Sequence, residues 1–418
     1  MSDLTLRPAV EADIPTLVDI EVRAFNRDDE AHRQQVGQEV HHGLGHYVVL
    51  LRGDETVGCA RIGRDWLRVG SCQVLKGDVG HVAIRPELHG QGLGTEMMQR
   101  VITHMREHGF HLSRLGGLMK FYARFGYEPF IRRYVHIPAP RLDDNMKGEI
   151  WRDRLGVPDP NATFVRPYHP TLDHEAVHRL RYRFSARRSG QIVMNPEPSS
   201  PGGGEPDPDG LLFVYDDGEV RGWLQGGLGL VHAGETEPSY RIDDFACDRA
   251  CPEAVGALVK ALIERAQDRA PTTLVCRLPY DEDLFIALNA ANLPFEAVEM
   301  RTAVDGNMMQ VVNLSATLAV VAPELSERLE GTPTWQGRIR FVLPGQMATL
   351  EVSPDAVHVV DDASLDLEIR ASQADFIKWL FGIVGFAESV PAAALTPAQR
   401  QMLSLLFPRC PCASGPWG

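Results

Sequence analysis

A glycine-rich stretch at residues 89–95, HGQGLGT, has the composition of a phosphate-binding loop. It lies between a strand-like run at 78–85 (DVGHVAIR) and a helix-like run at 96–108. Glycines let the backbone approach a ligand closely, because no side chains intervene. The unpaired amides at the start of the following helix suit a pyrophosphate group. For the glycines alone, a tight strand-to-helix turn without a ligand is the alternative.

The segment 118–130, LMKFYARFGYEPF, follows the helix-like run and brings phenol groups to it. Strand, glycine loop, helix and FYARFGY together resemble the acetyl-CoA-binding core of the GNAT-type N-acetyltransferases. The usual loop reads Arg or Gln, two residues, Gly, one residue, Gly or Ala. Here His89 takes the first position, and Gly92 and Gly94 are in place. The departure at His89 is compatible with phosphate binding, because backbone amides would supply most of it.

The resemblance implies how a thioester would be held and cleaved. Backbone groups of Val82, Ala83 and Ile84 would pair with the pantetheine arm as an added strand, although a buried strand without a ligand would look the same. The pyrophosphate would lie on residues of the loop and first helical turn: Gly90, Gln91, Gly92, Leu93, Gly94 and Thr95. Tyr122 would protonate the departing thiolate, since a phenol with a pKa near ~10 stays neutral at working pH. The alternative for Tyr122 is a core aromatic residue, and Tyr127 is assigned to the core.

A first segment, 1–140, is expected to form the mixed α/β unit that positions this site. Its predicted strands are 4–8, 47–52, 56–66, 78–85 and 134–137, and its predicted helices are 11–25, 96–108 and the FYARFGY segment. Pro and polar residues accumulate through 138–160 and predict an inter-domain linker.

A second segment, 158–304, repeats this order of elements. Its predicted strands are 211–215, 221–226, 241–247 and 273–278, and its predicted helices are 172–185 and 252–269. The strand–helix junction reads DRACPEA, without a Gly-x-Gly. We interpret this segment as a second GNAT-like fold that has lost its cofactor loop. An unrelated α/β domain is the alternative.

A third segment, 305–418, begins with a strand that enters a helix at 311–325. Hairpin strands are predicted at 337–343, 347–352, 356–360 and 365–369, and helices at 373–381 and 397–407. An antiparallel sheet with helices to one side resembles the sterol-carrier-protein-like domains. The predicted fold class is therefore α/β (α+β), with two tandem GNAT-like mixed-sheet domains before an antiparallel α+β domain.

This layout resembles the enhanced-intracellular-survival (Eis) type of acetyltransferase, as does the segment 305–313, DGNMMQVVN. In those enzymes the terminal carboxylate, on a closing aromatic residue, enters the first domain's site and can accept a proton or orient an ammonium group. Here Trp417 is penultimate and Gly418 carries the carboxylate. Gly418 is therefore the candidate base, and a frayed tail is the alternative. The resemblance also implies a homo-oligomer, which is a hexamer in that family.

Other polar residues near the first segment have plainer explanations. Asp28, Asp29 and Glu30 lie in a region that borders the acceptor site in this family, but a solvated charged loop accounts for them. His41, His42 and His46 are assigned to the surface or to strand ends.

The composition limits the remaining classes of function. The chain has 418 residues, 44% of them hydrophobic, enough for two or three packed domains. Its net charge of -14 disfavours nucleic acid as the main partner and mildly favours a cationic substrate, although acidic surfaces also serve solubility. The sequence has no run of eighteen apolar residues and no charged-then-apolar leader, so we expect neither a membrane span nor a signal peptide. Seven scattered cysteines indicate a reducing, cytoplasmic compartment, and their spacing predicts no metal site.

The sequence thus predicts an acetyl-CoA-dependent N-acetyltransferase that acts on an amine of a small cationic acceptor, with aminoglycoside-like or polyamine-like compounds implied. Two other functions stay open. One is a non-catalytic protein that couples acyl-CoA sensing to lipid binding, and the other is acetylation of a protein lysine or N-terminus. Tyr122 together with the loop favours an enzyme. A broad, negatively lined cleft would favour small polyamines, whereas a long shallow groove would favour peptides.

Overall fold

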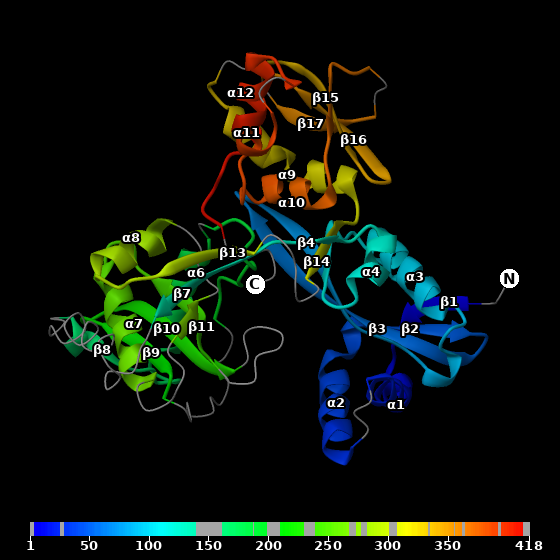
Figure 1. Cartoon of the computed structure of the whole chain (residues 1–418), viewed down its shortest axis with the longest axis horizontal. Helices are drawn as coiled ribbons and strands as arrows, with labels where there is room; N and C mark the ends of the chain where they lie inside the picture. Colours follow the sequence, from blue (N-terminus) through cyan, green and yellow to red (C-terminus); the bar gives the residue numbers. More distant parts are fainter. Residues whose placement is uncertain are drawn as a thin grey trace.

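The computed structural model places most of the chain in three β-sheets with helices packed on them (Figure 1). It describes residues 4–25, 29–138, 161–186, 188–198, 210–229, 239–266, 273–276, 282–300, 307–332, 335–354, 356–361, 364–391 and 394–412. The predicted mixed α/β fold is confirmed. The linker predicted at 138–160 lies almost wholly outside the described residues.

The first sheet carries the glycine loop and has the strand order β1-β2-β3-β4-β5-β14-β6. Its strands are β1 (Leu4–Pro8), β2 (Tyr47–Arg52), β3 (Glu55–Val69), β4 (Cys72–Ile84), β5 (Leu112–Leu115), β14 (Met308–Val311) and β6 (Glu128–Pro129). Among the described strands of this sheet, β4 and β5 form the one parallel pair. A parallel pair needs a crossover connection, and the loop-bearing helix α3 (Leu93–Glu107) supplies it.

Helices cover both faces of the first sheet, because successive strand residues point in opposite directions. In β2, Val48 and Leu50 pack in one core with α3, whereas Tyr47 and Val49 pack in another with α1 (Ile14–Ala24) and α2 (Glu30–Gly43). The remaining short helices of this part are η1 (Glu11–Asp13), η2 (Leu44–His46), η3 (Pro86–Leu88), α4 (Met119–Tyr122) and η4 (Ala123–Phe125).

Helix α2 was not predicted from the sequence. Asp29 is its N-cap, and its side chain accepts a hydrogen bond from the amide of His32 at 2.9 Å. Val36 and Val40 are buried on a helix that is otherwise mostly polar. The sequence therefore has too few apolar residues at helical spacing to predict a helix there. Asp29 and Glu30 are exposed as expected, but the expected loop is wrong for Glu30, which lies in the first helical turn.

Strand β4 contains a β-bulge shortly before the glycine loop. The register of β3 against β4 shifts between Cys59 and Arg61, so His81 and Val82 together face Ala60. His81 has a φ of 51°, in the left-handed region that few residues other than glycine adopt. A bulge bends a strand and redirects its side chains, and this one does so beside the C-terminal end of β4.

The second sheet has the strand order β13-β7-β12-β11-β10-β9-β8. Its strands are β7 (Arg132–Pro138), β8 (Val165–Pro167), β9 (Leu212–Asp216), β10 (Val220–Gly229), β11 (Ser239–Cys247), β12 (Thr273–Cys276) and β13 (Glu296–Met300). Its helices are η5 (Ala162–Phe164), α6 (His174–Ser185), α7 (Glu253–Ala266) and α8 (Glu282–Ala290). β11 pairs antiparallel with β10 and parallel with β12, as β4 does with β3 and β5.

The third sheet has the strand order β17-β16-β15-β18. Its strands are β15 (Gly337–Leu343), β16 (Gln346–Val352), β17 (Val357–Val360) and β18 (Leu367–Arg370), and the helices are α9 (Leu314–Leu329), α10 (Gln373–Leu380), α11 (Phe386–Ser389) and α12 (Pro397–Leu406). The expectation of a wholly antiparallel sheet is wrong, because β18 crosses to the far edge and pairs in parallel with β15. Apolar alternation within a strand is the same for parallel and antiparallel neighbours, so it does not fix the direction.

Strands are exchanged between the parts of the chain. β7, which follows the first sheet's β6 directly, lies in the second sheet between β12 and β13. β14, which precedes α9 and the third sheet, lies in the first sheet between β5 and β6. The β3–β4 hairpin also reaches α9, where the amide of Ser71 donates to Glu324 Oε2 at 2.8 Å (Figure 1).

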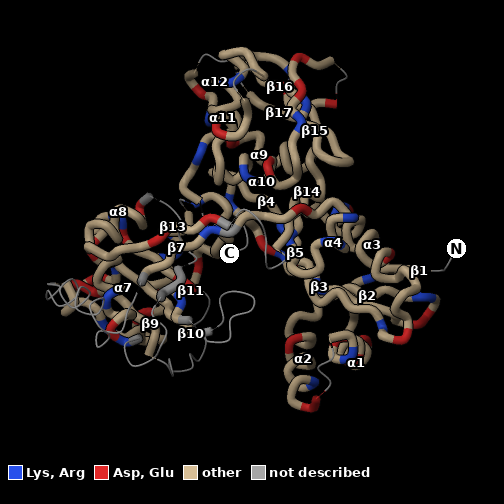
Figure 2. The backbone as a smooth tube through the Cα atoms, in the orientation of Figure 1, with Lys and Arg blue, Asp and Glu red and all other residues tan. Residues whose placement is uncertain are grey.

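Acidic residues occur in all three parts, interspersed with basic ones (Figure 2). Among the described helices, none is long and apolar enough to cross a membrane.

Candidate functional site

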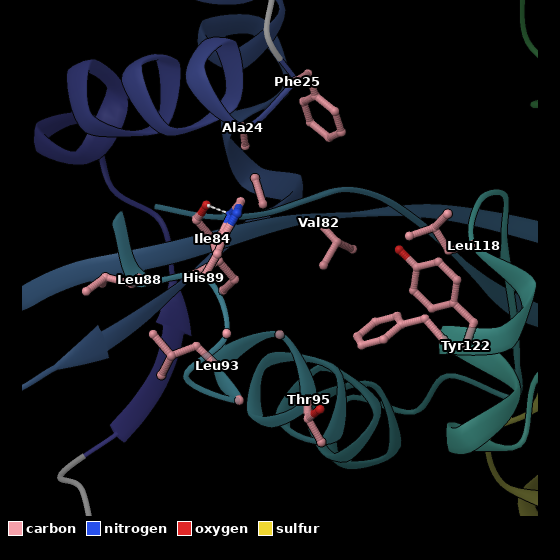
Figure 3. A pocket seen from close by; sticks show the side chains of 15 residues that line it. Ala24, Phe25, Val82, Ile84, Leu88, His89, Leu93, Thr95, Leu118 and Tyr122 are labelled. Atoms are coloured by element: carbon pink, nitrogen blue, oxygen red, sulfur yellow. Dashed lines mark hydrogen bonds between the residues drawn. The ribbon is translucent and has the colours of Figure 1, made fainter. Parts of the chain in front are cut away.

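A cavity of about 450 Å³ lies between the C-terminal end of β4 and the N-terminus of α3 (Figure 3). We call it the loop cavity. It is lined by Ala24, Phe25, Val82, Ala83, Ile84, Leu88, His89, Gly90, Gly92, Leu93, Gly94, Thr95, Leu118, Phe121 and Tyr122. Of the predicted site residues that the structure describes, all except Gln91 line this cavity.

The glycine loop leaves a row of free backbone amides at one end of the loop cavity. Gly90 and Gly92 have φ of 79° and 80°, and Gly92 is the N-cap of α3. Within the described chain, none of the amides of residues 90–94 donates to a protein acceptor. Free amides at the positive end of a helix dipole form an anion site.

His89 has a structural task in this loop. Its Nε2 lies 3.0 Å from the carbonyl oxygen of Ile84, the last residue of β4 (Figure 3). This hydrogen bond holds the loop against the end of the strand. The departure from Arg or Gln at position 89 therefore leaves the amide row in place.

Two arginines flank the amide row. Arg52 Nη2 donates to Gln91 Oε1 at 3.4 Å, so the Gln91 side chain contacts β2 instead of lining the cavity. Arg124, from FYARFGY, donates to Thr95 Oγ1 at 3.1 Å. Positive charge thus lies near the end of the cavity where a pyrophosphate would bind.

The backbone of β4 is open on its β5 side beside the loop cavity. Parallel pairing with β5 runs from Lys76 to Val79 and then ends. Ala83 and Ile84 pair with β3 on the other side and Val82 belongs to the bulge, but none of the three pairs with a described strand on this side. An extended ligand with amide groups can occupy such an edge as an added strand.

Tyr122 lies at the opposite end of the loop cavity from His89, with its hydroxyl group on the side of Leu118 and Val82 (Figure 3). Burial raises its pKa, so the phenol stays protonated and can donate a proton. Gly117 has a φ of 138°, and a Cβ there would lie 3.1 Å from Tyr122 Cε2, so a glycine gives the ring room.

Tyr127 is buried as predicted, at 1% exposure, and its hydroxyl group lies 2.7 Å from Ser113 Oγ. The two tyrosines of FYARFGY thus differ: Tyr122 lines a cavity and Tyr127 anchors the core. Gly418, Trp417 and Asp28 lie outside the described residues.

A second cavity, of about 460 Å³, shares Phe25 with the loop cavity. We call it the acidic cavity. Its lining is Glu21, Phe25, His32, Gln35, Val36, Glu39 and His81. Sequence reasoning missed His81, although a histidine inside an apolar strand next to Val82 was a signal. No group of three or more His, Cys, Asp or Glu side chains in the described ranges is placed to hold a metal ion.

Comparison with known families identifies the part of the chain that carries the loop cavity. Residues 5–130 match the family model of an acetyltransferase (GNAT) domain. This part is a GNAT acetyltransferase domain. The protein is therefore an acyltransferase, and its loop cavity lies within the matched residues. No curated protein sequence matches the chain.

Solved structures share the fold over the full length of the chain. A GCN5-related N-acetyltransferase from Kribbella flavida is 17% identical with a TM-score of 0.62, and 98% of each chain is covered. One from Anabaena variabilis is 14% identical with a TM-score of 0.60, covering 97% of this chain and 96% of that one. Eis1 from Mycobacterium abscessus is 16% identical with a TM-score of 0.59, covering 98% and 99%. At these identities the likeness establishes the fold.

Proposed function

We propose that this protein transfers an acetyl group from acetyl-CoA to an amine of a small cationic molecule. One observation carries the proposal: an open strand edge, a row of free amides and a half-buried phenol line one cavity. These are the groups needed for pantetheine, for pyrophosphate and for the leaving thiolate.

The cosubstrate would lie along the loop cavity. Main-chain groups of Val82, Ala83 and Ile84 would hold the pantetheine arm. The backbone amides of the loop, including Gln91, would hold the pyrophosphate, with the charge of Arg124 nearby. Tyr122 would then donate its proton to the sulfur as the C–S bond breaks.

The acceptor is proposed to be cationic because of the acidic cavity beside the loop cavity. Glu21 and Glu39 line it, and the chain carries a net charge of -14. An amine on an aminoglycoside-like or polyamine-like molecule would enter there as an ammonium ion and meet negative charge. Acetylation of a protein lysine or N-terminus would need room for a peptide as well.

We further propose the domain organisation of the Eis type: a GNAT domain at 1–140, a second GNAT-like domain without a cofactor loop at 158–304, and a sterol-carrier-protein-like domain at 305–418. The repeated strand pairing around β4 and β11 supports the second part of this proposal. The whole-length likeness to Eis1 supports the order of the parts. We also propose a homo-oligomer, from the same resemblance, and a cytoplasmic location, from the scattered cysteines.

A thiol-release assay with acetyl-CoA against polyamines, aminoglycosides and peptides tests the proposal. We expect turnover with at least one cationic small molecule. Turnover with peptides alone would move the acceptor class to proteins, and no thiol release with any amine would contradict the proposed function.

Tyr122→Phe should lower kcat at least about tenfold and leave the affinity for acetyl-CoA unchanged, because it removes the proton donor and keeps the ring. Tyr127→Phe is the matched control. It makes the same change in the same segment, costs about 1 kcal/mol of stability through one lost hydrogen bond, and should leave kcat unchanged. Equal turnover in wild type and Tyr122→Phe would remove Tyr122 from the mechanism.

A further inference from the structure

Glu21 brings a buried carboxylate to the acidic cavity. Glu21 lies on the buried face of α1 together with Leu17 and Ile20, and it is 2% exposed. Its Oε2 lies 2.8 Å from Nδ1 of His81, and its buried Oε1 has no hydrogen-bond partner in the described chain. A buried charge with an unused acceptor is costly unless something else pairs with it. A cationic group in the cavity would be such a partner.

His81 is held in a strained conformation that directs its ring toward Glu21. A left-handed backbone costs a residue other than glycine about 1–2 kcal/mol, and histidine is among the residues that tolerate it. Such strain persists only where the surroundings enforce it, often at functional sites. Because of the bulge, His81 lines the acidic cavity while the next residue, Val82, lines the loop cavity.

The contact with Glu21 sets the chemistry of the imidazole ring. A carboxylate on Nδ1 fixes the proton of the neutral ring at Nδ1, which leaves Nε2 as a proton acceptor. The same arrangement orients the histidine of a Ser-His-Asp triad.

We propose that His81 is the general base of the acetyl transfer and that Glu21 positions it. The inference rests on the proposed function, since it needs an amine in the acidic cavity and a thioester in the loop cavity. Nε2 of His81 takes a proton from the bound ammonium group and passes it to solvent, which frees the nitrogen lone pair. The amine nitrogen then bonds to the thioester carbonyl carbon, and Nε2 takes a second proton from that nitrogen. The C–S bond breaks, and Tyr122 gives its proton to the sulfur. His81 then loses a proton to solvent, and Tyr122 regains one from it.

Charged groups from several elements surround His81. Glu21 comes from α1, Glu39 and His32 from α2, and Arg61 from β3. From β2, the ring of Tyr47 lies 6.1 Å from that of His81, centroid to centroid. The hydrogen bond that His81 donates to Glu21 is the largest influence and raises the pKa of His81, whereas burial and Arg61 oppose it. Since a base must be unprotonated, kcat/KM should fall as the pH drops through this raised pKa.

Replacing His81 with glycine tests the role of the ring. His81→Gly keeps the left-handed backbone and should lower kcat about 100-fold, within the range for loss of a general base. Added imidazole should restore a substantial part of kcat, a result that a purely structural role would not give. His81→Asn, which also tolerates this backbone, should be equally slow. His108→Gln, at the C-cap of α3, is the control and should match wild type.

Replacing Glu21 tests the positioning. In Glu21→Gln the acid limb of the pH profile should move to lower pH, because the carboxylate no longer stabilises the imidazolium. NMR titration of His81 in the free protein should show the same downward shift. Wild-type turnover in His81→Gly, or an acid limb that stays in place in Glu21→Gln, would overturn the inference.

Two further measurements separate this inference from its alternatives. Deletion of residues 417–418 should leave kcat within about threefold of wild type. If the deletion abolished turnover while His81→Gly stayed fully active, the base would instead be the terminal carboxylate. Failure of the wild type to acetylate any amine would contradict the proposed function instead. An active wild type whose kcat is unchanged in His81→Gly would contradict only the present inference.

Discussion

The chain contains two strand–turn–helix junctions on the same topological plan, and they differ in what the turn leaves free. Between β4 and α3, glycines keep the amides of 90–94 unpaired and a cavity lies beside them. Between β11 and α7, Asp248 accepts hydrogen bonds from the amides of Ala250 (3.0 Å, through its side chain) and Cys251 (3.0 Å, through its carbonyl), and Pro252 has no amide to offer. The amides that are free at the first turn are thus hydrogen-bonded within the second turn or, at Pro252, missing, so the second turn has no such amide row for a ligand.

Other features are kept in both parts. In the first, Arg7 of β1 makes two hydrogen bonds to Asp13, at 2.6 and 2.9 Å, and Asp13 also accepts from the amide of Val10. In the second, Arg166 of β8 makes two at 2.7 Å to Asp173, which accepts from the amide of His169. In both parts, therefore, an arginine on a strand makes a bidentate pair with a buried aspartate that precedes a helix, and this arrangement stabilises the fold.

The β-bulge also recurs, but with different side chains. In β11 the register against β10 shifts between Gln225 and Gly226, which leaves Asp243 as the extra residue. Asp243 pairs with Arg241 of its own strand at 3.1 Å. His81, at the corresponding bulge of β4, instead pairs with a buried carboxylate 60 residues away. The comparison separates residues that maintain the fold, which both parts keep, from the residues proposed to do chemistry, which occur in the first.

The largest effect should come from removing the left-handed glycines. A double variant, Gly90→Val with Gly92→Val, should weaken acetyl-CoA binding about 100-fold. Each β-branched residue is opposed by about 1–2 kcal/mol in this conformation, and 1.4 kcal/mol is tenfold in affinity. Calorimetric titration with acetyl-CoA measures the loss. Ala250→Val at the second junction is the matched control and should bind as wild type does; equal affinity in all three proteins would contradict the role of the first loop.

A smaller, shared effect is expected at the bidentate pairs. Arg7→Met and Arg166→Met should each destabilise the protein by about 2 kcal/mol, because a buried carboxylate loses its partner. This energy is smaller than for a fully buried ion pair, because both arginines are partly exposed. The hydrogen bonds from Arg7 lower the pKa of Asp13, so the stabilisation is full above the unfolded pKa and is lost as pH falls through the folded one. Urea denaturation at neutral and acidic pH should show a difference from wild type that shrinks in acid. A difference independent of pH would argue against the ionic origin.

The smallest effect should come from the second bulge. Asp243→Asn should change kcat less than about twofold, since a partly exposed pair on one strand contributes little. The useful measurement is the kcat of Asp243→Asn compared with that of His81→Gly. A loss of acetylation in Asp243→Asn would mean that the second part also takes part in the reaction.

Local patterns predicted most of the fold. The predicted strands 4–8, 47–52 and 337–343 coincide with β1, β2 and β15, because alternation and turn residues mark their ends. The loop was found because glycine at a strand–helix junction is a local signal. His81 was missed because its role depends on a left-handed φ and on Glu21, and neither is visible in its neighbours. The exchange of β7 and β14 was missed for the same reason, since strand partners lie far apart in sequence.

The position of β14 has a consequence for synthesis. The sheet that bears the loop cavity stays incomplete until residues 308–311 have left the ribosome, long after β5 and β6. Until then, both of those strands have unsatisfied backbone groups that a neighbouring nascent chain can capture. A truncated protein that ends near residue 140 should therefore aggregate instead of yielding a small free-standing enzyme, and co-expression of the missing C-terminal portion should rescue it.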